Sequence, residues 1–400
     1  MLNKLSRAVI GFITIFFAIS CSNIELPENV SGKSKIYSML SYNLSPKIDR
    51  DSMYALLTSV GLEIEDYVVP EEYDFRVYDE DGTRIEQYYT KNNSDKKLMI
   101  VSNGGSFLNP YKIGRRDFYL NFSNKLLGFD VMIVDLHMGF QHRFPVQNKD
   151  FLNAYRLALK LGYSHNKIVF VGDSSGGNIV SSSTIYLRDN KLPLPAGIFL
   201  MSPFLDATNV VESRERNRKK DVLFGNPYNF ENRLKMLENI PYFIAEKDKT
   251  NRYISPIYAK DLKGFPKTLI HVSDYEILQD DSVVFYNNLK RSGVDATLVE
   301  YPGQLHVFQI LDIREAYDSI DKASEFINEI TNNKKHVKLK KEIIEKIRFE
   351  IKTEKYSNEE IQDFFKKIDI NIDQLIEFER HNYKTSNRNY LNSKDIYYKK

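Results

Sequence analysis

Cysteine is almost absent from this sequence, because Cys21 is the only one among 400 residues. A single thiol excludes an intramolecular disulfide, so burial of apolar side chains has to stabilise the fold. An excess of charge of one sign is also absent, since 56 lysine and arginine residues stand against 54 acidic residues. Lys4 and Arg7 are the only charged residues among the first 20, and removing that segment leaves 54 residues of each sign. With charges so balanced, the protein has no strong positive electrostatic potential to attract nucleic acid, and we expect no nucleic-acid partner.

Long apolar runs are missing as well, except at the N-terminus. The first segment, MLNKLSRAVIGFITIFFAISC, begins with basic residues and continues with an apolar stretch from Ala8 to Ile19. That stretch is shorter than the roughly 20 residues that a transmembrane helix needs, and it ends in small residues. The pattern predicts a secretory signal peptide over residues 1–20 and therefore an exported protein.

The position of Cys21 adds to this prediction. It follows Ala18-Ile19-Ser20 at the expected cleavage point, and this stretch resembles the lipobox of bacterial lipoproteins, with Ala18 where leucine is usual. We therefore expect acylation of Cys21 and a membrane-anchored lipoprotein on the extracytoplasmic side of the cell envelope, since two or more acyl chains anchor stably. The alternatives are a soluble secreted protein with an incidental thiol and an uncleaved anchor.

Compact apolar runs alternate with helix-length segments in the central part of the chain. The stretch DFRVYDEDGTRIEQYYT has Asp81-Gly82 between two alternating runs, which predicts a hairpin. The runs that follow are KKLMIVS, FDVMIVDL, KIVFVG, AGIFLMS, KTLIHVS and DATLVEY. Such runs predict an α/β fold with a mostly parallel central sheet and helices on both faces. Ligands bind to such sheets at the carboxyl ends of the strands.

The stretch GDSSGGN lies at one of these strand ends. Residues 172–176 fit G-x-S-x-G, the turn that lifts a nucleophilic serine onto a strained bend between a strand and a helix. The motif fits with Ser174 as its serine. With Ser175 as the serine, the motif would need glycine at position 173, which is Asp173. The alternatives are a plain turn and a phosphate-binding loop. The second is disfavoured, because the Gly-Lys-Ser/Thr that ends such a loop does not follow. The preceding strand and the helix start NIVSSSTIYL favour the nucleophile.

A nucleophilic serine needs a base and an acid that orients the base. His306, in YPGQLHVFQI, follows the last predicted strand, and the order serine, acid, histidine puts the acid after the strand before it. That place, HVSDYEILQDDS, holds four carboxylates that spacing does not distinguish: Asp274, Glu276, Asp280 and Asp281.

Together these motifs resemble the hormone-sensitive-lipase-like branch of the α/β-hydrolases. GDSSGGN is similar to the family's GDSAGGN, EILQDDS to its acid motif, QHRFP at 141–145 to EHRFP, and SPFLD at 202–206 to SPWLD. The resemblance covers about residues 75–330. It implies an α/β-hydrolase domain over residues 71–333 with a helical cap, to which an insertion at about 208–255 contributes. It also implies that Glu276 is the acid, with Asp274 as the alternative.

The family's oxyanion loop, usually HGGGF, corresponds to Asn103-Gly104-Gly105-Ser106-Phe107. By resemblance, the amides of Gly104, Gly105 and Ser175 would stabilise the oxygen that becomes negative during attack. Asn103 and Ser106 depart from the family pattern, and we expect them to affect the range of substrates.

The flanking segments have simpler patterns. Residues 21–70 are polar with scattered helical periodicity, which predicts a linker and N-terminal cap helices. Residues 334–400 are rich in charge, with Ile343, Ile347 and Ile351 at helical spacing, and predict a helical C-terminal extension. The basic run Arg214 to Lys220 is expected to be a solvated face.

The resemblance implies a carboxylesterase or lipase-like serine hydrolase that acts on short- to medium-chain acyl esters through an acyl-enzyme. Ser174 would be the nucleophile, His306 the base and Glu276 the orienting acid, with a small-molecule or lipid ester as substrate. No metal or organic cofactor is required. Two alternatives are a catalytically inactive surface binding protein on the same fold, against which the intact triad argues, and an amide or peptide hydrolase with the same triad.

Overall fold

The computed structural model describes residues 25–44, 69–91, 93–107, 113–126, 128–137, 142–225, 247–352, 357 and 359–360. Several predictions fall outside these residues: the signal peptide and Cys21, the part of the linker and cap at 45–68, the part of the cap insertion at 226–246, and the end of the extension at 361–400. Within the described ranges, no helix has the length and apolar character needed to cross a bilayer.

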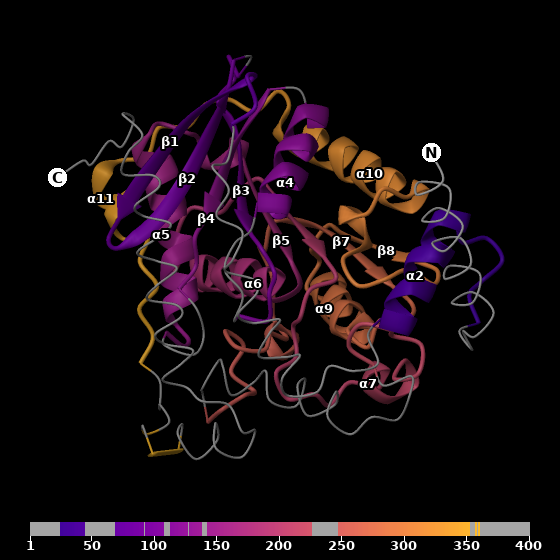
Figure 1. The fold of residues 1–400 in the computed structure, drawn as a ribbon. Helices are drawn as coiled ribbons and strands as arrows, with labels where there is room; N and C mark the ends of the chain where they lie inside the picture. The colour runs from indigo at the N-terminus through magenta and orange to yellow at the C-terminus, as the bar shows by residue number, and fades with distance from the viewer. Residues whose placement is uncertain are drawn as a thin grey trace.

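An eight-stranded sheet forms the centre of the molecule (Figure 1). Its strands, in chain order, are β1 (Tyr73–Glu80), β2 (Thr83–Thr90), β3 (Lys97–Ser102), β4 (Phe129–Val134), β5 (Ile168–Asp173), β6 (Gly197–Met201), β7 (Lys267–Ser273) and β8 (Ala296–Tyr301). The spatial order is β1-β2-β4-β3-β5-β6-β7-β8. β2 pairs antiparallel with β1 and β4, whereas all pairs from β4 to β8 are parallel. The predicted, mostly parallel α/β sheet is confirmed.

The predicted hairpin forms the first two strands. Glu80 lies opposite Thr83, so Asp81 and Gly82 alone make the turn. Both turn residues have positive φ, 52° for Asp81 and 83° for Gly82, as tight two-residue hairpin turns require.

Helices cover both faces of the sheet (Figure 1). The helices are α2 (Gly32–Leu44), α4 (Ile113–Leu126), α5 (Val146–Lys160), α6 (Ser174–Asp189), α7 (Ser213–Arg216), α9 (Gln279–Arg291), α10 (Arg314–Thr331) and α11 (Lys341–Glu345), with short 3-10 turns η1 (His165–Lys167), η2 (Pro256–Tyr258) and η3 (Phe308–Ile310). α4 and α10 pack on one face, and α5, α6 and α9 pack on the other.

Alternation along the central strands explains this two-sided packing. In β3, Leu98 and Ile100 face the layer with α5 and α6, whereas Met99 and Val101 face α4 and α10. All four side chains are fully buried, so the strand is apolar on both faces. Buried parallel strands therefore read as continuous apolar runs, and the six runs in the sequence correspond to β3 to β8.

The N-terminal segment, residues 25–44, packs against the edge of the molecule at β8 and α10 (Figure 1). The Ser31 amide and hydroxyl both donate to the carboxylate of Glu315, at 2.7 and 2.6 Å. The Ser34 hydroxyl donates to the side chain of Gln304 at 2.6 Å. Within its described part, this segment is therefore packed on the domain, whereas the sequence predicts a linker and N-terminal cap helices over residues 21–70.

The described part of the C-terminal extension packs on α5 and α6. Ile347 and Phe349 are buried in the same core as these helices. The helical spacing predicts a helix through Ile351, but α11 ends at Glu345. The reason lies in the backbone partners, because Arg156 donates to the carbonyl of Ile347 and the amide of Glu350 donates to the hydroxyl of Tyr186. Contacts with the core thus replace the hydrogen bonds of a helix.

Candidate active site

Ser174 stands at the junction of β5 and α6. The strand ends at Asp173 and the helix begins at Ser174, whose φ is 51°. A residue with a Cβ rarely adopts this left-handed conformation, and such strain is typical of the turn that presents a nucleophilic serine. Ser174 is 7% exposed, so its hydroxyl lies in a nearly closed environment.

Glycines let three backbone segments meet at this turn. A Cβ on Gly176 would lie 2.0 Å from the carbonyl oxygen of Ser102, at the end of β3. A Cβ on Gly172 would lie 2.7 Å from the carbonyl oxygen of Gly176. Real Cβ atoms do not approach so closely, so only glycine allows β3, β5 and the start of α6 to pack in this way.

The loop after β3, which carries the predicted oxyanion residues, lies against the nucleophile. A Cβ on Gly104 would be 2.8 Å from the Cβ of Ser174. Gly105 has a φ of 139°, which a side chain would strain. The hydroxyl of Ser175 accepts a hydrogen bond from the amide of Phe107 at 3.3 Å, and this bond ties the loop to α6. The structure thus brings Gly104, Gly105 and Ser175 to the side of Ser174.

The two departures from the family's loop have a structural role. Asn103 donates from its side-chain amide to the carbonyl of Gly104 at 2.8 Å, which fixes one peptide of the loop. Ser106, where the family has a third glycine, keeps a glycine-like φ of 57°. The backbone at Ser106 is therefore strained, because a residue with a side chain rarely adopts this conformation.

His306 and Glu276 form a buried pair on the same edge of the sheet. The Nδ1 of His306 lies 2.6 Å from Oε2 of Glu276, and the two side chains are 7% and 1% exposed. The other imidazole nitrogen, Nε2, is buried and has no hydrogen-bond partner in the described part of the chain. A histidine oriented through Nδ1 and open at Nε2 has the geometry of a general base for a nucleophilic serine.

The second oxygen of Glu276 is also fixed. Its Oε1 accepts hydrogen bonds from the hydroxyl of Ser202 at 2.7 Å and from the amide of Ser273 at 2.8 Å. Ser202 in turn accepts from the amide of Val307 at 3.2 Å, next to the base. One hydroxyl therefore connects the acid and the segment that carries His306. Ser202 stands in the SPFLD motif, but the motif gives no sign that its hydroxyl bonds the acid.

Two of the other candidate carboxylates have different partners. Asp274 accepts a hydrogen bond from the amide of Gly303 at 2.7 Å and so shapes the loop before His306. Asp280 pairs with Arg216 at 2.5 Å. Among the four candidates, Glu276 is the one that the structure pairs with the imidazole.

Asp281, the remaining candidate, is fully buried and holds the chain after β6. It accepts from the amides of Leu205 and Asp206 at 2.7 and 2.9 Å and pairs with Arg214 at 2.8 Å. Burial raises the pKa of Asp281 to about 6, against the opposing charge of Arg214. Its role is to fix the loop that contains SPFLD.

Aromatic side chains complete the surroundings of the site. The ring of Phe224 meets the imidazole of His306 edge-on, with centroids 4.7 Å apart. The hydroxyl of Tyr119 donates to the buried carboxylate of Asp173, the residue before the nucleophile. Nothing in the sequence pattern distinguished Phe224 or Tyr119, because both lie in segments without a motif.

His142, in the QHRFP stretch, belongs to a separate pair of histidines. Its ring lies 4.6 Å from that of His137, which contacts Asp150. Burial, followed by the nearby imidazole of His137, lowers the pKa of His142. Throughout the described ranges, no group of three or more histidine, cysteine or acidic side chains is arranged to bind a metal ion.

The chain belongs to the α/β hydrolase fold family. A family model with that description matches residues 104–310, which are 207 of the 400 residues. The predicted membership in the α/β-hydrolases is confirmed.

Several named relatives are esterases. The chain is 28% identical over 200 residues to an esterase of Acinetobacter venetianus, a match over 49% of this chain and 63% of that protein. It is 32% identical over 183 residues to an arylesterase of Saccharolobus solfataricus, over 44% of this chain and 57% of that protein. The chain thus spans less than two thirds of the length of these two relatives.

Solved structures share the fold over a greater length. An esterase from the bacterial hormone-sensitive lipase family superimposes with a TM-score of 0.66, at 23% identity, over 76% of this chain and 99% of that one. The likeness therefore extends over most of both chains, and it concerns the fold.

Proposed function

We propose that this protein is a serine carboxylic ester hydrolase that acts on short- to medium-chain acyl esters through an acyl-enzyme. The main support is the pairing of His306 with Glu276, whose Nδ1 and Oε2 atoms lie 2.6 Å apart. Nε2 of His306 has no hydrogen-bond partner among the described residues. Ser174 stands in a strained turn on the same edge of the sheet, beside Gly104. The names of the relatives, an esterase and an arylesterase, support this activity.

Acylation begins when the hydroxyl oxygen of Ser174 attacks the carbonyl carbon of the ester. Nε2 of His306 takes the hydroxyl proton, and the carboxylate of Glu276 stabilises the imidazolium through Nδ1. The tetrahedral intermediate then collapses. The bond to the alcohol oxygen breaks, and Nε2 returns the proton to the departing alcohol.

Deacylation repeats these steps with water. The water oxygen attacks the acyl carbon of the ester on Ser174 while Nε2 of His306 accepts its proton. Collapse releases the carboxylic acid and returns the proton to the serine oxygen. In each half, the amides of Gly104, Gly105 and Ser175 would bind the negative oxygen, and removal of one such donor costs about 3–4 kcal/mol in a well-studied protease.

The test is hydrolysis of a series of p-nitrophenyl esters from acetate to palmitate by the protein without its signal peptide. We expect turnover that is highest for short and medium acyl chains and is lost in Ser174→Ala. Equal turnover by folded Ser174→Ala would reject the mechanism. No turnover of any ester by the folded protein would favour the inactive binding protein, and turnover of p-nitroanilides alone would favour the amide hydrolase.

A second part of the proposal concerns the membrane. We propose that Cys21 is acylated and that it anchors the protein on the extracytoplasmic side of the cell envelope, because the segment before it resembles a lipoprotein signal. Growth with an alkyne-tagged palmitate should label the wild-type chain and leave Cys21→Ser unlabelled. Equal labelling of both chains would contradict a lipid at this position.

A further inference from the structure

The N-terminal segment enters the described structure beside the catalytic acid. The carbonyl of Glu25 accepts a hydrogen bond from the hydroxyl of Tyr275 at 2.6 Å. Tyr275 directly precedes Glu276, which pairs with His306. The place where the chain leaves the described domain toward Cys21 is therefore at the catalytic edge of the sheet.

Further contacts fix this place. A Cβ on Gly303 would lie 2.7 Å from Cδ of Pro27 and 3.0 Å from Cγ2 of Val30, so the segment packs directly on the loop that leads to His306. The double hydrogen bond from Ser31 to Glu315 follows within the next few residues. Glu25 therefore has a defined position relative to the active site.

The chain between Cys21 and Glu25 is short. Four residue steps separate them, and an extended chain spans at most about 3.5 Å per step, or about 14 Å in total. Acyl chains on Cys21 insert into a bilayer, so the membrane surface would lie within about this distance of Glu25.

Exposed lysines lie next to the same place. Nζ of Lys220 is 5.2 Å from the ring centroid of Tyr275, and Lys219 and Lys220 are both exposed. They end the basic run whose earlier members Arg214 and Arg216 pair with aspartates. Lysines at a membrane surface attract anionic lipid headgroups.

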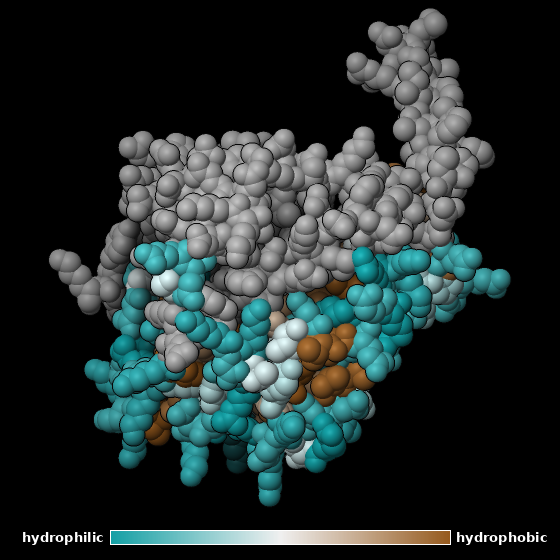
Figure 2. Space-filling model, turned by 90° about the horizontal axis from the view of Figure 1, so that it is seen from below, coloured by the Kyte–Doolittle hydropathy of each residue, from teal (hydrophilic) through white to brown (hydrophobic). Residues whose placement is uncertain are grey.

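The molecular face that contains α7, seen from below in Figure 2, also carries clustered apolar side chains among hydrophilic ones. The loop before α7 exposes 67% of Val210. Lysines and exposed apolar side chains on one face of a molecule are typical of surfaces that contact the interface of a bilayer.

We propose that the surface formed by Glu25, Lys219, Lys220 and Tyr275, the exit surface, faces an anionic lipid bilayer. The carboxyl edge of the sheet, with the active site, then opens toward the membrane that holds the anchor. This inference rests on the ester hydrolase and the lipid anchor proposed above. It names the substrate class as esters presented at the bilayer surface, which are lipids or other amphiphilic esters.

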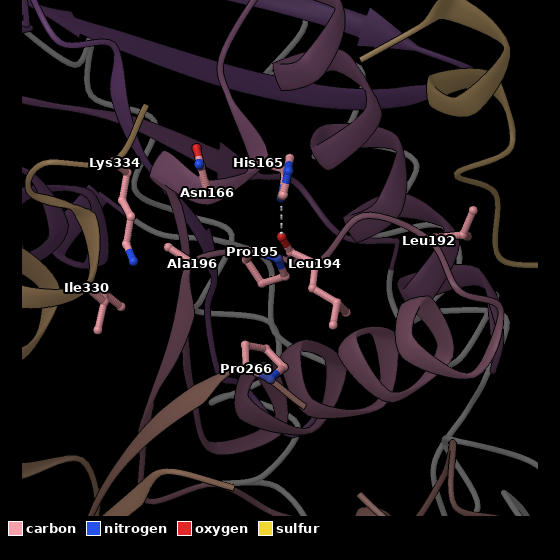
Figure 3. Close-up of a pocket in the computed structure, with 9 residues that line it drawn as sticks. All are labelled: His165, Asn166, Leu192, Leu194, Pro195, Ala196, Pro266, Ile330 and Lys334. Carbon is pink, nitrogen blue, oxygen red and sulfur yellow. Dashed lines mark hydrogen bonds between the residues drawn. The ribbon is translucent and has the colours of Figure 1, made fainter. Parts of the chain in front are cut away.

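The opposite edge of the sheet provides a control position. An open cavity of about 450 Å³ lies at the amino ends of β5, β6 and β7 (Figure 3), whereas Ser174 follows the carboxyl end of β5. Lys334 lines this cavity and is exposed, as Lys219 is on the exit surface. Lys219→Cys and Lys334→Cys are therefore matched variants at opposite edges.

The experiment uses the fact that Cys21 is the only native cysteine. In the acylated full chain, a new cysteine at position 219 or 334 is the only free thiol, and each takes an environment-sensitive fluorophore. The labelled proteins are reconstituted into vesicles of phosphatidylglycerol and phosphatidylcholine, with and without nitroxide-labelled lipid. Acylation of each sample is verified by intact mass.

We expect nitroxide lipid to quench the probe at position 219 several-fold more strongly than the probe at position 334. Equal quenching, stronger quenching at 334, or absence of quenching at both positions would overturn the proposed orientation. An intact mass without acyl chains would overturn it as well, because the membrane would then have no defined distance from Glu25.

A second readout separates this inference from the esterase itself. Hydrolysis of water-soluble p-nitrophenyl butyrate should be the same for the anchored protein and for Cys21→Ser, whereas hydrolysis of a diacylglycerol ester embedded in the vesicles should be several-fold faster for the anchored protein. Equal rates on the embedded ester would reject the membrane-facing active site. Loss of butyrate hydrolysis in both proteins would reject the esterase while leaving the quenching result to decide the orientation.

Discussion

Glu276 and Asp274 lie two positions apart in one loop, yet they have different partners. Sequence spacing leaves both as candidates, because the direction of each side chain depends on how the loop folds. In the structure Glu276 pairs with the imidazole of His306, and Asp274 accepts from the amide of Gly303. This difference makes the choice of acid testable.

Glu276→Gln should lower kcat by about 10³-fold or more, since loss of the corresponding carboxylate has such an effect in serine proteases. Asp274→Asn is the matched control and should lower kcat by less than about tenfold, because it weakens one hydrogen bond to a loop amide. Steady-state kinetics on p-nitrophenyl butyrate measure both. The reverse ranking would assign the orienting role to Asp274.

Ser202 is the second residue whose role follows from geometry alone. Ser202→Ala removes a hydrogen bond to the carboxylate of Glu276 and one from the amide of Val307. A hydrogen bond to a charged group contributes about 1.5–3 kcal/mol, so we expect kcat to fall roughly 10- to 100-fold. KM should change little, because Ser202 positions the acid and does not contact substrate.

The control for this variant is Ser324→Ala, on α10, whose hydroxyl donates to the carbonyl of Ile320 in the preceding turn of the same helix. The comparison of kcat with KM separates positioning from simple destabilisation, since a loosened acid lowers kcat while the folded variant still binds substrate. An unchanged kcat in Ser202→Ala would contradict the positioning role.

Among the elements, the close packing of β3, β5 and α6 determines whether the turn can present Ser174 to a substrate. Gly176→Ala would put a methyl group 2.0 Å from the carbonyl oxygen of Ser102. Because that neighbour is backbone of a central strand, the strand has to move, and we expect a loss of about 2–3 kcal/mol or more in the free energy of unfolding.

Gly32→Ala is the matched control, because a Cβ at Gly32 meets nothing within 4 Å. Its free energy of unfolding should stay unchanged or rise by up to about 1 kcal/mol. Urea unfolding followed by circular dichroism compares the two variants. A stable and fully active Gly176→Ala would show that the three segments do not pack as closely as described.

The sequence predicts the elements themselves well and their docking poorly. The runs from KKLMIVS to KTLIHVS predict β3 to β7 because strands that are buried on both faces are rich in apolar residues, and the run DATLVEY predicts the partly exposed β8. The docking of residues 25–44 could not be predicted, because Ser31 and Glu315 are 284 positions apart and neither stands in a motif. The early end of α11 depends in the same way on Arg156, which comes from a distant helix.

At the scale of the whole molecule, the C-terminal extension is part of the hydrolase core as far as the structure describes it. Phe349 is 1% exposed and stacks against Tyr186, with centroids 4.3 Å apart. Phe349→Ala should therefore lower the free energy of unfolding by about 3–5 kcal/mol. Ile343→Ala, at a side chain that is 37% exposed, should cost much less.

Both variants can be compared by urea unfolding together with activity on p-nitrophenyl butyrate. Equal stability of Phe349→Ala and the wild-type protein would mean that the extension does not stabilise the domain. The same contacts explain why residues 334–352 follow the domain surface: aromatic and aliphatic side chains anchor them to α5 and α6.

Ser174 is the proposed nucleophile, and a covalent adduct would identify it. We would treat the folded protein with a fluorophosphonate and locate the adduct by peptide mass spectrometry. We expect one adduct per chain, on Ser174, that forms more slowly in His306→Asn and is absent in Ser174→Ala. An adduct that persists in Ser174→Ala, or no adduct on the folded wild-type protein, would contradict this role of Ser174.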